Sequence, residues 1–179
     1  FNWNPVVETW RTNMHTREND VVFKSIMGIS WFWFFGATLL TQLPNYTLNV
    51  LVANDDVYIL LLAMFSVGVG IGSVLCERLS GEVVEIGLVP IGSFLITLFC
   101  ADLYFASASF ASLQHASPLS LSAFWEIAGS WRILIDIVFI GIAGGFFIVP
   151  LYALVQQRSE PRIRSRIIAG NNIFNALFM

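Results

Sequence analysis

The side chains that could bind a ligand in this sequence lie inside or beside long apolar runs. Asp136 follows Arg132 by four residues, so the two share one face of a helix. An acid at this place is either half of a local ion pair or a group that faces a cavity or gate. Both interpretations of Asp136 stay open on the sequence.

Three amides, Asn171, Asn172 and Asn175, form a second polar feature near the end of the chain. Their spacing places them in one stripe along a helix. Within a bilayer these amides should hydrogen-bond to another helix, to the preceding arginine-rich loop or to a substrate. We favour bonding between helices and keep all three residues as candidates for a substrate cavity.

An aromatic cluster around Trp31 and Trp33 lies well inside the first apolar run, with Phe32, Phe34 and Phe35 beside it. Tryptophan usually lies at the membrane interface, so this depth is unusual. The cluster either packs against helices and lipid or lines a cavity for a lipid. Gln42, further along the same run, is another candidate cavity residue.

The sequence contains no Gly-x-Ser-x-Gly elbow and no cluster of metal ligands. We therefore predict no catalytic residues, no cofactor and no metal in this chain.

Composition places these residues in a membrane. The 179 residues are 56% hydrophobic and only 12% charged, about half the charge of soluble domains, which is about 25%. This composition argues against a soluble enzyme, and the net charge of -3 argues against a nucleic-acid partner.

Long uncharged runs predict membrane-spanning helices, because about 20 apolar residues cross a bilayer. Pro44 should end the first run. We predict an all-α, polytopic membrane protein with four complete spans and a truncated fifth, at about 22–43, 57–76, 84–105, 131–155 and 167–179. Because the last run has no charges after it, we expect the sequence to be a piece of a longer protein.

The basic residues predict the orientation of these spans. If residues 1–20 are a cytoplasmic linker, eight of the nine Lys and Arg lie inside and only Arg132 lies outside. The inner positions include Arg78 and a basic loop with Arg158, Arg164 and Arg166.

Small residues predict where helices approach one another. Gly68 and Gly72 are four residues apart in the second span, so they offer one smooth face to another helix. Gly144 and Gly145 should do the same in the fourth span, where Pro150 should bend the helix.

Two longer segments, residues 144–158 and 164–172, resemble the lysophospholipid transporter family of the major facilitator superfamily. Residues 30–34 and 75–81 also resemble it. The similarity covers about residues 20–179 and is strongest to the transporter domain that many bacteria fuse to an acyl-ACP–phospholipid O-acyltransferase. It implies the C-terminal half of a twelve-helix bundle, with helices seven to ten complete and helix eleven begun.

The resemblance also implies a function and partners. It predicts alternating-access movement of a lysophospholipid, lysophosphatidylethanolamine in particular, across the bacterial inner membrane. Implied partners are membrane lipid, the missing N-terminal half and an acyltransferase, fused or separate. In the superfamily's cytoplasmic loop motif only Arg78 and Gly81 match well, with Glu82 or Glu85 as acidic partners. Two alternatives stay open, a non-transporting membrane module of a fused acyltransferase and a permease for another small solute.

Overall fold

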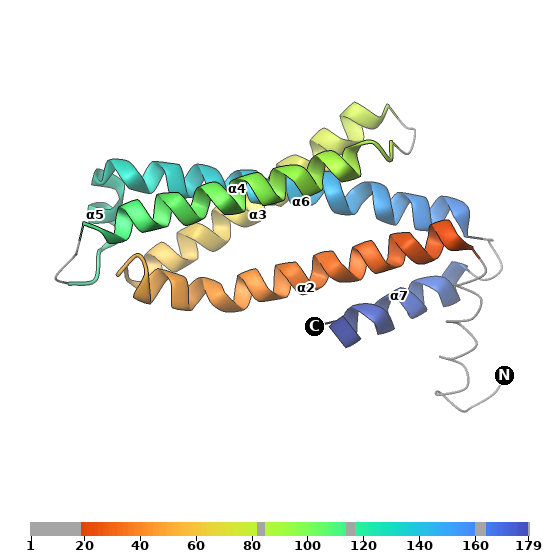
Figure 1. The fold of residues 1–179 in the computed structure, drawn as a ribbon, viewed down its shortest axis with the longest axis horizontal. Helices are drawn as coiled ribbons and strands as arrows, with labels where there is room; N and C mark the ends of the chain where they lie inside the picture. The colour runs from red at the N-terminus through yellow and green to blue at the C-terminus, as the bar shows by residue number, and fades with distance from the viewer. Residues whose placement is uncertain (1–18, 82–84, 114–116, 160–163, 179) are drawn as a thin grey trace. The chain divides into compact units, whose positions relative to one another are not determined.

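The computed structural model describes residues 19–81, 85–113, 117–159 and 164–178, and these residues are almost entirely helical (Figure 1). The helices are α2 (Asp20–Asn49), α3 (Asp55–Ser80), α4 (Leu88–Ala111), α5 (Leu121–Glu126), α6 (Ala128–Arg158) and α7 (Arg164–Phe178). Four of them, α2, α3, α4 and α6, are long and apolar enough to cross a membrane. The prediction of an all-α, polytopic membrane protein is confirmed. Most of the predicted linker over 1–20 lies outside the described residues.

The ends of α3 follow from local sequence. Asn54 caps its N terminus, where the side-chain oxygen accepts a hydrogen bond of 3.3 Å from the backbone N–H of Val57. Asp55 and Asp56 occupy the first turn, where negative charge is favourable. Gly81 ends the helix in a left-handed conformation, with φ of 53°.

Helix α2 differs from the sequence prediction at Pro44. The helix continues through this proline to Asn49 instead of ending there. A proline removes one backbone hydrogen bond. Unwinding the chain in an apolar environment would leave several backbone groups unsatisfied, so continuing the helix costs less.

Residue contacts divide the chain into two compact units, and the long helices α2 and α6 contribute to both. We call residues 38–147 the central unit. The terminal unit contains the described residues up to Ala37 together with those from Ile148 onward.

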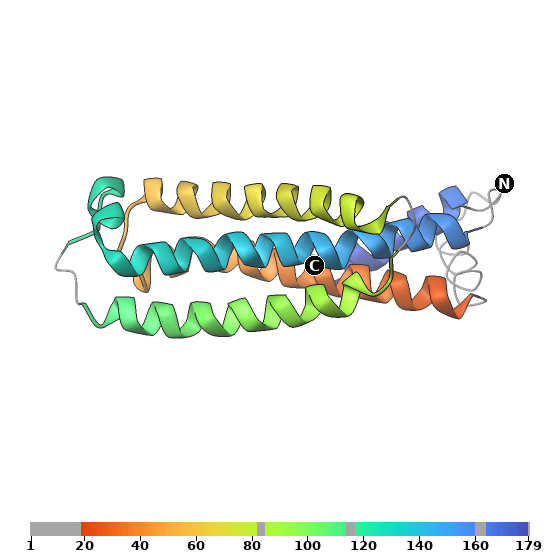
Figure 2. The ribbon, with the colours of Figure 1, turned by 90° about the horizontal axis from the view of Figure 1, so that it is seen from above.

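In the central unit, α6 runs between α3 and α4 (Figure 2). A Cβ atom added to Gly72 of α3 would overlap the carbonyl oxygen of Ile142 in α6, and one added to Gly145 would lie 2.6 Å from the backbone nitrogen of Ser73. On the other side, a Cβ on Gly92 of α4 would lie 2.7 Å from the backbone nitrogen of Phe147. The three helices therefore touch backbone to backbone, which only glycine allows at these places.

A buried apolar cluster closes one end of the central unit. It contains Leu51, Val57, Leu61, Phe110, Phe124, Ile133 and Ile137. The connection after α2 pairs with the segment before α5, where Leu119 donates a backbone hydrogen bond of 2.8 Å to Val52. This cluster holds the N-terminal end of α6, and with it Arg132 and Asp136, against α3, α4 and α5.

In the terminal unit, α7 lies beside the first half of α2 (Figure 1). The rings of Phe23 and Phe174 meet edge to face with their centroids 6.4 Å apart. This contact packs α7 against α2 one position before Asn175.

Candidate functional site

The terminal unit contains a buried hydrogen bond between α2 and α7. Ser30 Oγ donates to Asn175 Oδ1 over 2.9 Å, and both side chains are buried. Asn175 therefore bonds to another helix, which is the interpretation the sequence favoured for this stripe.

The three asparagines of α7 have different surroundings. Asn171 is 2% exposed, and its Oδ1 has no hydrogen-bond partner among the described residues. Asn172 is exposed. One residue of the stripe thus bonds to a helix, one offers a buried acceptor and one is open to a ligand.

The aromatic cluster of α2 has one polar contact. Trp33 Nε1 donates a hydrogen bond of 2.9 Å to the hydroxyl of Tyr152 in α6. Trp31 stacks on Phe35 with ring centroids 5.9 Å apart. Both tryptophans are exposed, at 44% and 40%, so they form an open aromatic surface.

In the central unit, Arg132 of α6 pairs with Asp102 of α4. Arg132 Nε donates to Asp102 Oδ2 over 3.0 Å, and Nη2 donates to Oδ1. On the sequence, an ion pair of Arg132 with Asp136 was one of two open interpretations, and Asp102 was not considered as a partner. One signal could have found Asp102. It flanks one apolar run and Arg132 flanks the next, at ends that the predicted topology places on the same side of the membrane.

Asp136 is buried, with 1% of its surface exposed. Its Oδ2 atom has no hydrogen-bond partner among the residues that the structure describes. The described residues therefore show no ion pair between Arg132 and Asp136, and the cavity-or-gate role of Asp136 stays a prediction.

A small cavity lies beside these charges, in the same unit. It has a volume of about 300 Å³ and is lined by Tyr46, Val50, Cys100, Leu103, Tyr104 and Ser107. The hydroxyls of Tyr46 and Ser107 lie 2.7 Å apart in a hydrogen bond between α2 and α4. Sequence reasoning missed both hydroxyls, because each is a common residue with no motif around it.

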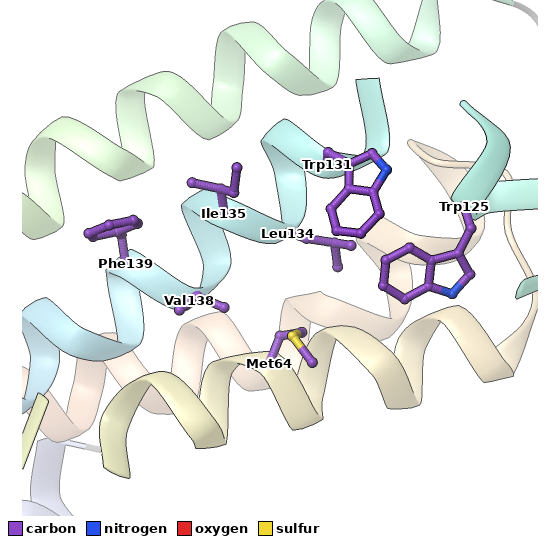
Figure 3. Close-up of a pocket in the computed structure, with 7 residues that line it drawn as sticks. All are labelled: Met64, Trp125, Trp131, Leu134, Ile135, Val138 and Phe139. Carbon is purple, nitrogen blue, oxygen red and sulfur yellow. The ribbon is translucent and has the colours of Figure 1, made fainter. Parts of the chain in front are cut away.

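An apolar groove lies on the other side of α6 (Figure 3). It has a volume of about 200 Å³ and is lined by Met64, Trp125, Trp131, Leu134, Ile135, Val138 and Phe139. Trp125 and Trp131 meet at one end with ring centroids 4.7 Å apart. The groove was not predicted, since its wall combines residues from α3, α5 and α6.

The remaining predicted residues lie apart from these features. Gln42 and Arg78 are exposed, on α2 and at the end of α3. Gly68, Gly144 and Pro150 are buried, and a Cβ on Gly68 would overlap the carbonyl oxygen of Val138.

The loop that should carry basic charge is only partly described. Arg158 is exposed at the end of α6. Glu82 and the side chains of Arg164 and Arg166 lie outside the described residues. Within the described ranges, no three His, Cys, Asp or Glu side chains come together as metal ligands would.

Comparison with known proteins identifies relatives of this chain. No family model and no solved structure matches it. It is 29% identical over 153 residues to the protein named Lysophospholipid transporter LplT from Yersinia pestis (strain Pestoides F), and equally similar to the protein of that name from Yersinia pseudotuberculosis serotype O:3 (strain YPIII). These matches cover 83% of the chain but only 30% of each relative. They support the assignment of the chain to the lysophospholipid transporter family, the family that residues 144–158 and 164–172 resemble.

Proposed function

We propose that this chain is part of a transporter that moves a lysophospholipid across the bacterial inner membrane by alternating access. The observation that carries the proposal is the similarity to proteins named as lysophospholipid transporters over 153 residues. Four helices of membrane-spanning length and composition agree with such a protein.

We further propose lysophosphatidylethanolamine as the substrate and an N-terminal half of the transporter as the partner. In this proposal residues 1–20 are cytoplasmic, and the chain supplies the second half of a major-facilitator bundle. Alternating access then needs both halves to rock about a central site.

A lysophospholipid has one acyl chain and a polar headgroup, so its carrier needs apolar walls as well as hydrogen-bonding groups. The groove along α6 supplies an apolar wall that ends at the indoles of Trp125 and Trp131. Its side chains suit an acyl chain and exclude a small polar solute.

Groups that suit a headgroup occur in the terminal unit. Asn172 is exposed, and Asn171 carries a buried oxygen for which the described ranges provide no hydrogen-bond partner. An ammonium or hydroxyl of the headgroup could donate to such an amide oxygen. The exposed indole of Trp33, oriented by Tyr152, could attract the ammonium of an ethanolamine through its ring face.

The decisive experiment is lysolipid movement by the full-length protein in vesicles. We expect reconstituted protein to speed the transfer of lysophosphatidylethanolamine between leaflets, and Asn172→Leu to slow it at normal expression. Gln157→Leu is the matched control, because it removes an exposed amide of the same unit that lies on α6 and not on α7.

The outcomes separate the competing functions. If the protein moved no lysolipid and instead showed an acyltransferase activity that depends on its membrane part, that result would replace the proposed transporter with a non-transporting membrane module. Movement of a small polar solute instead of lysolipid would point to a permease.

A further inference from the structure

The charges around the start of α6 do not balance. Asp102 and Asp136 provide two carboxyl groups, and Arg132 provides the only guanidinium that contacts either of them among the described residues. Arg132 uses two nitrogens to hold both oxygens of Asp102. Asp136 therefore has no basic group of its own in this conformation.

The groups that face Asp136 come from three helices. Tyr46 of α2, Cys100 and Asp102 of α4 and Arg132 of α6 all interact with it electrostatically. From α3, Tyr58 packs on the neighbouring apolar cluster. Apart from Arg132, none of these side chains carries a positive charge.

A carboxylate buried without a partner is costly, because it loses its hydration and gains no countercharge. Asp136 is 1% exposed, and its Oδ2 has no hydrogen-bond partner in the described parts of the chain. A bound proton removes the charge and makes one carboxyl oxygen a donor. The carboxyl of Asp102 interacts with Asp136, so it is an acceptor that the protonated form could use.

We propose that Asp136 is a proton-binding site, occupied in this conformation, and that it releases its proton when Arg132 moves from Asp102 to Asp136. The role of the site in lysolipid movement rests on the proposed function.

The geometry permits this exchange. Arg132 and Asp136 are four residues apart on α6, a spacing at which an arginine reaches a carboxylate on the same helix. The Asp102 side chain is 38% exposed and the Arg132 side chain is 51% exposed. The ion pair can thus open without unpacking buried side chains.

The released proton needs a path to water. Tyr46 and Cys100, which interact with Asp136, also line the cavity of about 300 Å³. The step is balanced, since the O–H bond of Asp136 breaks, water accepts the proton and the new carboxylate pairs with Arg132.

A metal cation fits this place less well than a proton. Hard cations take several oxygen ligands at once. Here both oxygens of Asp102 are engaged by Arg132, which leaves too few free oxygens around Asp136.

Infrared difference spectroscopy on the full-length protein tests proton binding directly. On raising the pH we expect the carbonyl band of a protonated carboxylic acid to disappear in the wild type. Asp136→Asn should lack this band, whereas Glu126→Gln, which changes an exposed acid on α5, should keep it. A band that persists in Asp136→Asn, or no band in the wild type, would overturn the proposal.

A second variant tests the exchange without altering Asp136. In Asp102→Asn the guanidinium of Arg132 loses its charged partner, so it should pair with Asp136 and expel the proton. We therefore expect loss of the same band in Asp102→Asn. An unchanged band in a folded Asp102→Asn protein would contradict the exchange of partners.

Lysolipid movement in vesicles links the site to transport. We expect its rate to depend on pH in the wild type and to lose that dependence in Asp136→Asn. A rate of lysolipid movement that does not change with pH but depends on sodium would overturn the proton site and leave the proposed function intact. Conversely, an Asp136 band in a protein that moves no lysolipid would keep the site and refute the function.

Discussion

The hydroxyl of Ser30 donates a hydrogen bond to the side-chain oxygen of Asn175, 145 positions further along the chain. Both side chains are buried, and the bond joins α2 to α7 inside the terminal unit. In an apolar environment such a bond gives two helices a defined register.

Removal of this bond should destabilise the protein. We expect Asn175→Leu to lower the free energy of unfolding by about 1 kcal/mol, because Ser30 then loses its partner. Thermal unfolding of the full-length protein in detergent measures the effect. Ser30→Ala should cost a similar amount, and the double variant should cost less than the sum.

The neighbouring amide provides the control for this prediction. Asn172→Leu alters an exposed residue on the same helix, so it should leave the unfolding temperature unchanged while slowing lysolipid movement. Equal destabilisation by Asn172→Leu and Asn175→Leu would show that the hydrogen bond to Ser30 does not contribute measurably to stability.

A methyl group at the contact between α3 and α6 should disrupt the central unit. Gly145→Ala would place a Cβ 2.6 Å from backbone atoms of Gly72 and Ser73, so the helices must move apart. We expect a loss of about 1–3 kcal/mol in stability, visible as a lower unfolding temperature and lower yield.

Gly70→Ala is the matched control, since a Cβ at Gly70 of α3 would meet nothing within 4 Å. There alanine should be neutral or stabilise the helix by up to about 1 kcal/mol. If Gly145→Ala proved as stable as Gly70→Ala, the close approach of α3 and α6 would be refuted.

The hydrogen bond from Trp33 to Tyr152 should orient the exposed indole. Tyr152→Phe removes the acceptor and keeps the ring, so we expect slower lysolipid movement without loss of folding. Trp33→Phe should slow movement to a similar degree or further. The rate of transfer in vesicles is the measurement, and additive losses in the double variant would contradict a joint role.

Filling the apolar groove should discriminate between substrates by chain length. Ile135→Trp narrows the groove beside Val138, so we expect long-chain lysolipids to move more slowly, with a smaller effect on short-chain ones. Ile91→Trp on α4 is the control, because both isoleucines are 49% exposed and Ile91 does not line the groove. Equal effects of the two variants would remove the groove from substrate binding.

Much of the fold could be predicted from local sequence. A helix that crosses a bilayer must bond its own backbone and present apolar side chains, so each apolar run predicts its helix. The cap at Asn54 and the left-handed Gly81 are likewise local features, although the helical course through Pro44 was not predicted. The resemblance of residues 144–158 and 164–172 also predicted a family, and the 29% identity to proteins named Lysophospholipid transporter LplT agrees with it.

Contacts between side chains of different helices could not be predicted from the local sequence. Periodicity placed Asn171, Asn172 and Asn175 in one stripe, but only the folded chain shows that Asn175 bonds to α2, that Asn171 is buried and that Asn172 is exposed. Gly92 lacked a small residue four positions away, and its role became visible only beside Phe147 of α6.

The pairing of Arg132 is the sharpest example of this division. Spacing along α6 suggested Asp136, one turn away, whereas the folded chain brings Asp102 of α4 to the guanidinium. Spacing reports only which groups share a helix face, and it contains no information about the facing helix. The packing of α4 against α6 brings Asp102 to Arg132, and among the described residues Asp136 is left buried with no ion-pair partner.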